Sequence, residues 1–453
     1  MDALSRSSGA NEWSRPRPPP SDAPFPRGPP RRKSLISFSN LLESAIEAMI
    51  GVAQMSTSEI VEIVGLGLAT LAVLFAYPGF HTERRTRQFL QGIKTLQTQR
   101  GVLNARALSE APDTWKCHDI PLLTRSSWIP EKPIDLDEIA ISPWRGELER
   151  VTTSHPRRRG ERAFRPLNLR TGTGYSAALR ERADKNNIWD GAIYALSDVD
   201  MENLNLRFSV DGYFAYLDTS EVLAYEAAQR LSIGRSRVLA GGLRRQLKDP
   251  FDFSNRTASL GVNTLTLRNK NGQLTFFLHQ RESNLIASDS QLIGAVPAGE
   301  FTPSDRTQDS LRSDFSLWRN IMREYAEEFL DEEEARGKGG TWIDYDRSSP
   351  YVELTKARSR SRLRVWFMGI GLDPLTWKPE LLTVSVINAR EFDIIFSNMV
   401  SENSEGLLLQ GHAKIGLPFE MGTVARYLSA PDVAPSAKSL LQLAWTHRAL
   451  LQT

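Results

Sequence analysis

The sequence has very little cysteine and histidine. Its 453 residues include one cysteine, Cys117, and six scattered histidines. A single cysteine excludes an intramolecular disulfide framework and favours a reducing compartment. These residues do not have the spacing of a zinc site. The sequence also lacks a phosphate-binding P-loop, a dinucleotide-binding glycine fingerprint and a Ser-His-Asp nucleophile elbow, so it does not point to the enzyme classes that use them.

An excess of charge of one sign is missing as well. The chain has 56 Lys and Arg against 54 Asp and Glu, a net charge of +2. Because so small a net charge gives no general case for nucleic acid, we expect no direct nucleic acid partner. With 40% hydrophobic and 24% charged residues, the chain is long enough to bury two or more cores.

The long apolar runs lie near the N-terminus. Residues 1–34 are rich in Pro, Arg and Ser, which predicts a disordered basic tail. Residues 60–77 carry one charge, Glu62, and would span about 27 Å as a helix. Residues 35–53 form another apolar stretch, and basic residues flank the pair on both sides. If basic flanks stay inside, residues 35–78 form a transmembrane helical hairpin with the globular part in the cytoplasm at the cell membrane.

A single membrane crossing is the alternative to the hairpin. Glu43 and Glu47 fall on one helical face of the stretch 35–53. Each would cost roughly 2–3 kcal/mol at the middle of a bilayer. That stretch could therefore lie in the membrane interface instead of crossing it.

Two segments connect these runs to the main globular part. Residues 79–166 are predicted to be a helical and irregular linker, with a helix over residues 82–108 that could pair with its copy in a homo-oligomer. Residues 167–256 are predicted to be an α+β extension of the globular domain. Within it, residues 204–210 alternate like a strand and residues 219–231 have a helical pattern.

Residues 314–330 predict an acidic helix. Apolar residues recur there every three or four positions, which indicates one buried stripe. Glu324, Glu327 and Glu328 stand at i, i+3 and i+4 and so share one side of the helix. Three carboxylates in that arrangement can bind a hard divalent cation, Mg²⁺ or Mn²⁺. Arg323 is placed to pair with Glu327.

Predicted strands flank this helix. Residues 260–268 and 273–281 are rich in β-branched and aromatic residues, and the turn between them ends in Asn-Gly, which strongly indicates a hairpin. Residues 363–371 and 381–387 read as two further buried strands. The order is therefore hairpin, a Pro-Ala-Gly loop, the acidic helix and more strands.

Residues 323–328, Arg-Glu-Tyr-Ala-Glu-Glu, resemble the second half of the Nudix box. The family pattern is Gly, five residues, Glu, seven residues, then Arg-Glu-aliphatic-any-Glu-Glu-any-Gly. Gly299 resembles the opening glycine, but it lies 24 residues before Arg323 instead of fourteen. Phe315 stands where the upstream Glu belongs, and Leu330 where the last Gly belongs. The first half of the box is therefore degenerate.

The resemblance implies a Nudix-like α/β/α sandwich with a mixed sheet over residues 257–453. It also implies that the box binds Mg²⁺ and activates water against a diphosphate. Carried onto this chain, Glu327 and Glu328 would chelate the metal and Glu324 would bind metal or orient water. Arg323 would hold these carboxylates in place. Gly299 and Glu300 would form the loop at the phosphates.

These features together predict a membrane-anchored, cytosol-facing Nudix-like domain that binds a diphosphate-linked nucleotide with Mg²⁺, and that hydrolyses it if the incomplete motif retains activity. One alternative is an inactive nucleotide-sensing effector that acts through its membrane helices. In layout, that alternative is similar to Nudix effectors of bacterial cyclic-oligonucleotide defence systems. Another is a non-enzymatic scaffold, because acidic surface helices are usually only solvated and this one continues as acids through residues 331–334.

Overall fold

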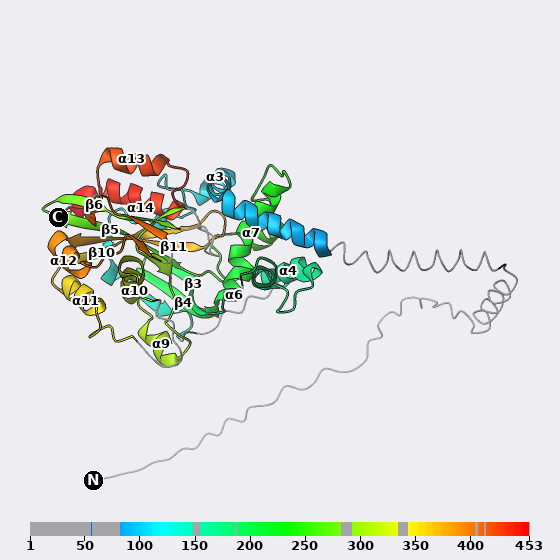
Figure 1. Cartoon of the computed structure of the whole chain (residues 1–453), viewed down its shortest axis with the longest axis horizontal. Coiled ribbons are helices and arrows are strands. Elements are labelled where there is room, and N and C mark those ends of the chain that lie inside the picture. The colour runs from blue at the N-terminus through cyan, green and yellow to red at the C-terminus, as the bar shows by residue number, and fades with distance from the viewer. Residues whose placement is uncertain are drawn as a thin grey trace, which may run out of the picture. The chain divides into compact units, whose positions relative to one another are not determined.

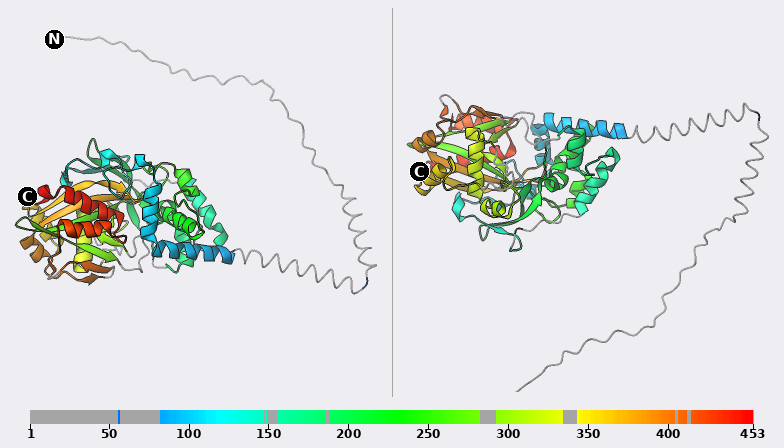
Figure 2. Two further views of the ribbon diagram at one scale, coloured as in Figure 1. Left: turned by 90° about the horizontal axis from the view of Figure 1, so that it is seen from above. Right: turned by 60° about the horizontal axis from the view of Figure 1, so that its bottom comes forward.

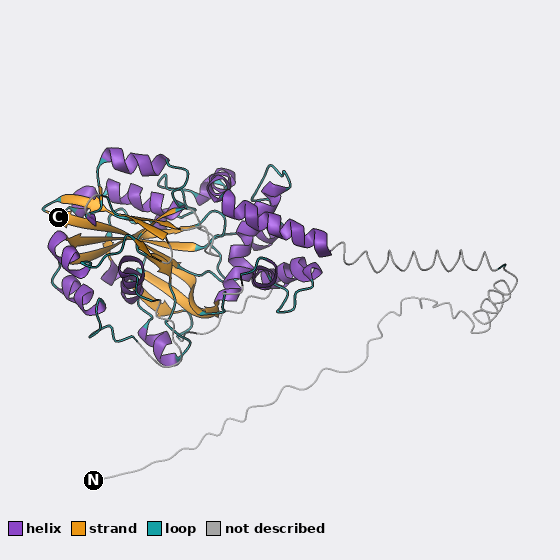
Figure 3. Ribbon diagram, viewed as in Figure 1, coloured by secondary structure: helices purple, strands orange, loops and turns teal. Residues whose placement is uncertain are grey.

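The computed structural model describes residue 56 and residues 82–146, 148, 155–185, 188–281, 292–333, 343–403, 406–411 and 414–452. Helices and strands in these residues form an α+β structure with mixed sheets (Figure 3). The α+β part of the predicted fold class is confirmed.

The predicted transmembrane hairpin requires a correction. Among the described residues, no helix is both long enough and apolar enough to cross a membrane. The membrane hairpin is therefore not supported as part of the fold. The predicted tail at residues 1–34 and the predicted hairpin at residues 35–78 lie outside the described residues, apart from Ser56.

The largest sheet among the described residues has seven strands. Its order is β1-β10-β11-β5-β6-β14, and β9 pairs with the first part of β5. β10 is antiparallel to β11, whereas β11 is parallel to β5, so the sheet is mixed. The strands are β1 (Ile134–Asp135), β5 (Gly261–Lys270), β6 (Gln273–Phe276), β9 (Ala298–Glu300), β10 (Leu363–Leu372), β11 (Pro379–Asn388) and β14 (Leu417–Pro418).

The predicted hairpin is confirmed for its first strand and its turn. β5 and β6 pair antiparallel, and Asn271 and Gly272 connect them with φ of 54° and 84°. Positive φ at both turn residues is what a two-residue hairpin turn needs. The second predicted strand is interrupted at Phe277, after which β7 (Leu278–Arg281) joins another sheet.

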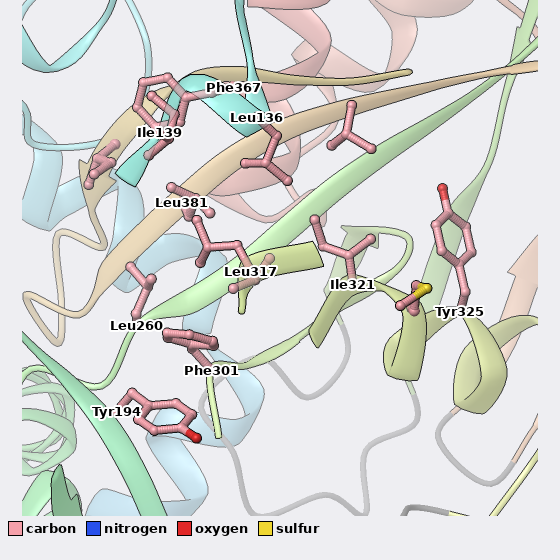
Figure 4. Close-up of a cluster of buried hydrophobic side chains, with 14 of the residues drawn as sticks. Leu136, Ile139, Tyr194, Leu260, Phe301, Leu317, Ile321, Tyr325, Phe367 and Leu381 are labelled. Carbon is pink, nitrogen blue, oxygen red and sulfur yellow. The ribbon is translucent and has the colours of Figure 1, made fainter. Parts of the chain in front are cut away.

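Helices cover both faces of the seven-stranded sheet (Figure 1). On one face, α14 (Pro435–Thr446) packs against β5, β10 and β11, and α13 (Met421–Ser429) packs on α14. The other face carries α10 (Leu317–Leu330), α11 (Tyr351–Ser359) and α12 (Ala389–Ile395). Ile321 and Tyr325 of α10 lie on the side of the sheet that carries Leu381 of β11 and Leu260, just before β5 (Figure 4). This layering buries the apolar stripe of α10.

Two smaller sheets complete the described strands. A four-stranded sheet has the order β12-β13-β7-β8, and a three-stranded sheet has the order β2-β4-β3. Their remaining strands are β2 (Ala140–Pro143), β3 (Ala192–Asp200), β4 (Asn205–Gly212), β8 (Ile293–Ala295), β12 (Glu402–Asn403) and β13 (Gly406–Leu409). β3 also bridges to Ser259 just before β5, which attaches this sheet to the strands of the main one.

Helices of the extension pack around a buried polar turn. α6 (Tyr213–Tyr216), the π-helical turn η5 (Leu217–Glu221) and α7 (Val222–Ser232) follow one another, and every residue of η5 is buried. The neighbouring helices are residues 82–98, α3 (Arg100–Glu110), α4 (His155–Phe164), α5 (Tyr175–Arg182) and α8 (Gly242–Leu247). Ser220 and Thr219 of η5 hydrogen-bond the backbone of Thr257, immediately before the main sheet.

Residues 112–143, which we expected to be irregular, contribute strands to the seven-stranded and the three-stranded sheets. β1 pairs with β10, and β2 runs parallel to β4. Leu122, Leu123 and Trp128, which precede β1, are buried. These pieces are too short to show a period in the sequence, so only the packing reveals them.

Candidate functional site

α10 forms as the sequence predicts. The Ser316 side chain accepts a hydrogen bond from the Arg319 amide and caps the first turn, and Asp331 ends the helix with φ of 56°. Ile321, Tyr325 and Phe329 are fully buried. The Tyr325 hydroxyl lies 2.8 Å from that of Thr266 on β5. This packing fixes which residues of α10 can face outward.

Glu328 holds β9 to the helix. Its side chain is buried, and one carboxylate oxygen accepts a hydrogen bond of 2.9 Å from the Ala298 amide. The other oxygen lies 3.6 Å from Nδ1 of His279, which is buried on β7. The Glu328 carboxylate therefore faces the protein interior and the Pro-Ala-Gly segment.

Glu324, one turn earlier, lies directly on Gly299. A Cβ atom added to Gly299 would be 2.1 Å from the carboxyl carbon of Glu324. Only a residue without a side chain lets the carboxylate lie this close to the strand backbone. Glu324 is partly exposed, unlike Glu328. The structure thus brings together the glycine and the acidic helix that the Nudix resemblance pairs.

Asn320 and Arg323 bind Thr302, two residues after the end of β9. The Asn320 side chain accepts hydrogen bonds from the Thr302 amide at 3.3 Å and from Arg323 at 3.0 Å, and Arg323 also donates to the Thr302 carbonyl. Burial by itself would lower the pKa of Arg323. The nearby Tyr345, Asp314, Glu324 and Glu327 outweigh it, and the pKa of Arg323 is raised. Arg323 is therefore a charged residue that ties the helix to Thr302, two residues after β9.

Glu327 lies near Arg323 and also near α11. It is partly exposed and close enough to Tyr351 of α11 to act on it electrostatically. Burial raises the pKa of Tyr351 to about 12, and the carboxylates of Glu332 and Glu327 contribute to that rise. The three predicted acids therefore share α10 but have three different surroundings.

Glu300 faces away from α10. Its carboxylate lies 2.5 Å from the Lys378 ammonium and accepts a hydrogen bond from Ser259. Lys378 also lies 3.6 Å from Glu380 on β11. Glu300, Gly261 and Glu380 stand side by side on β9, β5 and β11, so they share one face of the sheet. Because successive strand residues alternate faces, Gly299 and Glu300 cannot point to one site.

Phe315 occupies the position at which the Nudix box has its upstream Glu, and its ring packs among other aromatic rings. Its ring is 5.1 Å from that of Tyr194, 5.8 Å from that of Phe208 and 5.9 Å from that of Phe301. A Glu at this position would replace these ring contacts with a charged group beside partly buried aromatic residues, which is unfavourable. The position is used for packing instead.

No preformed cluster of three ligands is seen in the described part of the chain, where no three His, Cys, Asp or Glu side chains converge as metal ligands do. Glu324 and Glu327 are the two acids that keep partial exposure. Glu324 lies against the backbone at Gly299, so a cation held by this carboxylate would also lie near β9. Mg²⁺ commonly uses one or two carboxylates together with phosphate oxygens.

Three residues of this region were not selected from the sequence. Lys378 follows Trp377, a buried residue at φ of 58° in the tight link between β10 and β11, and nothing in the sequence signals this geometry. Asn320, four positions before Glu324, could have been found by extending the acidic stripe by one turn. His279 lies within the predicted strand 273–281, and its buried side chain packs beside Glu328.

Comparisons with protein-family models and with curated proteins do not identify a relative from which a function could be assigned. No protein-family model matches the chain, and the curated proteins include none that is significantly similar to it. The case for function therefore depends on the residues and geometry described above.

Proposed function

We propose that this protein binds a diphosphate-linked nucleotide together with Mg²⁺ where β9 lies against α10, as its resemblance to the Nudix box implies. The observation that carries the proposal is the contact of Gly299 with Glu324. Gly299 lies about ten residues further from the acidic helix in sequence than the family pattern has it, yet it contacts Glu324. The Ala298–Glu328 hydrogen bond fixes the same strand on the same helix.

The proposed roles of these residues differ with the solvent exposure of their side chains. Glu324 and Glu327, which are partly exposed, would hold the cation, and bound Mg²⁺ would supply positive charge that neutralises the phosphates. Glu328 would position the Ala298–Gly299 backbone, and Arg323 would keep Glu324 and Glu327 oriented. Gly299 would let the diphosphate approach the backbone closely.

Phe315 favours binding without rapid turnover. The carboxylate that the family places at this position would be a further ligand or base, and here a partly buried aromatic ring that packs against the core replaces it. A nucleotide-sensing protein that hydrolyses its ligand slowly or not at all is therefore the second candidate. A scaffold whose acidic helix binds no ligand is the third.

A ligand panel tests the proposal. The full chain is titrated with nucleoside diphosphates, their sugar-linked derivatives and dinucleoside polyphosphates, with and without Mg²⁺, while binding and product release are measured. We expect Mg²⁺-dependent binding of at least one compound. Glu324→Gln and Glu327→Gln should each weaken it about 10–100-fold, as loss of a metal ligand or its support does.

The matched control is Glu333→Gln. Glu333 is an exposed acid in the same run, just after the end of α10, and its removal should leave binding unchanged. Turnover in the wild type that is lost in the Glu324→Gln or Glu327→Gln variant would establish that the protein is an enzyme. Binding without turnover would establish that it is a sensor. If no compound of the panel binds, the non-enzymatic scaffold is the remaining candidate.

A further inference from the structure

β9 is held from two sides. From α10, the Glu328 carboxylate accepts the hydrogen bond of the Ala298 amide. From the opposite face of the sheet, the Lys378 ammonium lies 2.5 Å from the carboxylate of Glu300. The strand has three residues, and Gly299 lies between these two attachments. The strand at the candidate site is therefore also held by a residue on the far side of the sheet.

Lys378 ends a hydrogen-bonded turn between β10 and β11. The Asp373 carboxylate accepts hydrogen bonds from the amides of Leu375 and Thr376, at 2.9 and 2.7 Å. The Lys378 amide donates to the Thr376 hydroxyl at 3.1 Å, and the Lys378 carbonyl accepts a bond of 2.8 Å from the Asp373 amide. Because both backbone polar groups of Lys378 are bound, the start of its side chain has a fixed position.

The Lys378 ammonium serves two carboxylates of one row of the sheet. Glu300 on β9 and Glu380 on β11 stand on either side of Gly261, and Glu380 lies 3.6 Å from the ammonium. A Cβ atom added to Gly261 would be 2.1 Å from Glu380 and 2.9 Å from the ammonium. Glycine on the middle strand therefore leaves the room in which the lysine can reach across to β9.

Solvent screens this ion pair only weakly. The Lys378 side chain is 12% exposed, and those of Glu300 and Glu380 are 30% and 9% exposed. Burial raises the pKa of Tyr213 on α6, Glu300 and Glu221 raise it further, and Lys378 lowers it, so the extension also lies near this group. Figure 2 shows the green helices of the extension at one end of the main sheet. Partly buried pairs keep much more of their attraction than exposed ones, which contribute little.

We propose that Lys378 is a positioning residue for the contact of Gly299 with Glu324. By binding Glu300, it holds β9 from the face opposite α10, and it acts on the site through the strand instead of through a ligand. The consequence for ligand binding rests on the proposed function, whereas the consequence for β9 is measured without a ligand.

Hydrogen–deuterium exchange of the full chain without ligand tests the effect on β9. Lys378→Met removes the charge of the side chain, and we expect exchange in peptides that cover residues 298–302 to become about tenfold faster. Glu300→Gln should give a similar gain, and it remains as a test should Lys378→Met fail to fold. The matched control is Glu380→Gln, which removes a carboxylate beside the same ammonium that belongs to β11. It should leave residues 298–302 unchanged, and exchange in α14 should be the same in all variants.

Mn²⁺ titration followed by electron paramagnetic resonance tests the effect on the candidate site. Lys378→Met and Glu300→Gln should each weaken Mn²⁺ binding about 10–100-fold, as loss of a supporting group around a metal does. If the lysine acts through Glu300, the double variant should lose no more than either single variant. Glu380→Gln should bind Mn²⁺ as the wild type does.

The position of the failure separates the two claims. Wild-type exchange of residues 298–302 in Lys378→Met, or equal acceleration in Glu380→Gln, would overturn the role of Lys378. So would Mn²⁺ binding that depends on Glu324 but is unchanged in Lys378→Met. A wild type whose Mn²⁺ binding is absent, or is not weakened by Glu324→Gln, would instead contradict the proposed function, and faster exchange of β9 would still support the role of Lys378 in holding the strand.

Discussion

At Gly299, the absence of one carbon atom determines where a carboxylate can lie. The Glu324 side chain occupies the space that a Cβ would need, beside the amide that Glu328 holds. The blocking atoms belong to the mobile end of Glu324. A larger residue at 299 would therefore displace that carboxylate more than it would disturb the strand.

We predict that Gly299→Ala changes the free energy of unfolding by no more than about 1 kcal/mol. It should still weaken Mg²⁺-dependent ligand binding about 10–100-fold, because Glu324 must move. Urea unfolding and calorimetric titration measure the two effects. Gly294→Ala is the control, since the nearest atom to its added Cβ is 3.9 Å away. Equal loss of binding in both variants would contradict this account.

Glu328 should contribute to stability through the Ala298 amide. We predict that Glu328→Ala lowers the free energy of unfolding by about 1–3 kcal/mol, because it leaves a partly buried N–H without its acceptor. Glu328→Gln keeps an oxygen at that place and should cost less. Denaturant unfolding of both variants checks this order, and an alanine variant as stable as the glutamine variant would refute it.

Sequence spacing alone could identify the acids of this site but not their separate roles. Glu324, Glu327 and Glu328 share one side of a helix by their spacing, as predicted. Burial differs among them because β9 covers Glu328 and Glu324 unequally, and that depends on a strand 24 or more positions earlier. Glu300 was grouped with Gly299 because the two are neighbours in sequence, although adjacent strand residues face opposite ways.

At the scale of secondary-structure elements, α10 is held in place by the buried aromatic ring of Phe329 near its C-terminal end. Phe329 is fully buried, and its ring lies 4.9 Å from Phe396, 5.2 Å from Tyr325 and 5.7 Å from Phe277. These contacts join the helix to α12 and to the segment between β6 and β7. The side chain therefore packs where the two larger sheets approach each other.

Phe329→Ala should lower the free energy of unfolding by about 3–5 kcal/mol, the range for removing a buried aromatic ring. Met421→Ala on α13, where the side chain is 70% exposed, should change it by no more than about 0.5 kcal/mol. Urea denaturation followed by circular dichroism compares the two. A cost below about 1 kcal/mol for Phe329→Ala would show that α10 is not anchored as described.

The buried turn η5 should make stability depend on pH. Burial raises the pKa of the Asp218 carboxyl, and the Ser176 amide and Arg157 offset this only in part. The folded state then holds the proton at pH values where the unfolded state, with a pKa of about 3.9, has lost it. The contribution of Asp218 is therefore fully present below that value and falls as pH rises through the raised pKa.

Asp218→Asn removes this titration. The stability of the wild type relative to the variant should decrease as pH rises across that window and stay level above it. Urea unfolding of both proteins at a series of pH values measures the difference. A difference that is flat or increases with pH would contradict the assignment.

Elements with strong local signals were predictable, and those fixed by distant contacts were not. The Asn271-Gly272 turn and the period of α10 are encoded within a few residues. β1 and β2 have two and four residues, and they exist because β10 and β4 offer them partners. η5 departs from the predicted regular helix because the hydroxyls of Thr219 and Ser220 bond the chain at Thr257.

At the scale of the whole molecule, the mixed sheet separates two polar regions. The Gly299–Glu324 contact lies on the face covered by α10, and the Glu300–Lys378–Glu380 group lies on the opposite face. α4 and the helix over residues 82–98, from distant parts of the sequence, pack together through Phe164 and Phe89. Net charge and composition could not predict this distribution, because folding brings distant segments together.

Anomalous diffraction from crystals of the full chain grown with Mn²⁺ and a diphosphate compound tests the central claim most directly. Mn²⁺ replaces Mg²⁺ at oxygen ligands and can be located by its own signal. We predict an anomalous peak between Glu324, Glu327 and the backbone at Gly299, with diphosphate oxygens beside it. A peak elsewhere, or none there when the diphosphate is bound, would contradict the account.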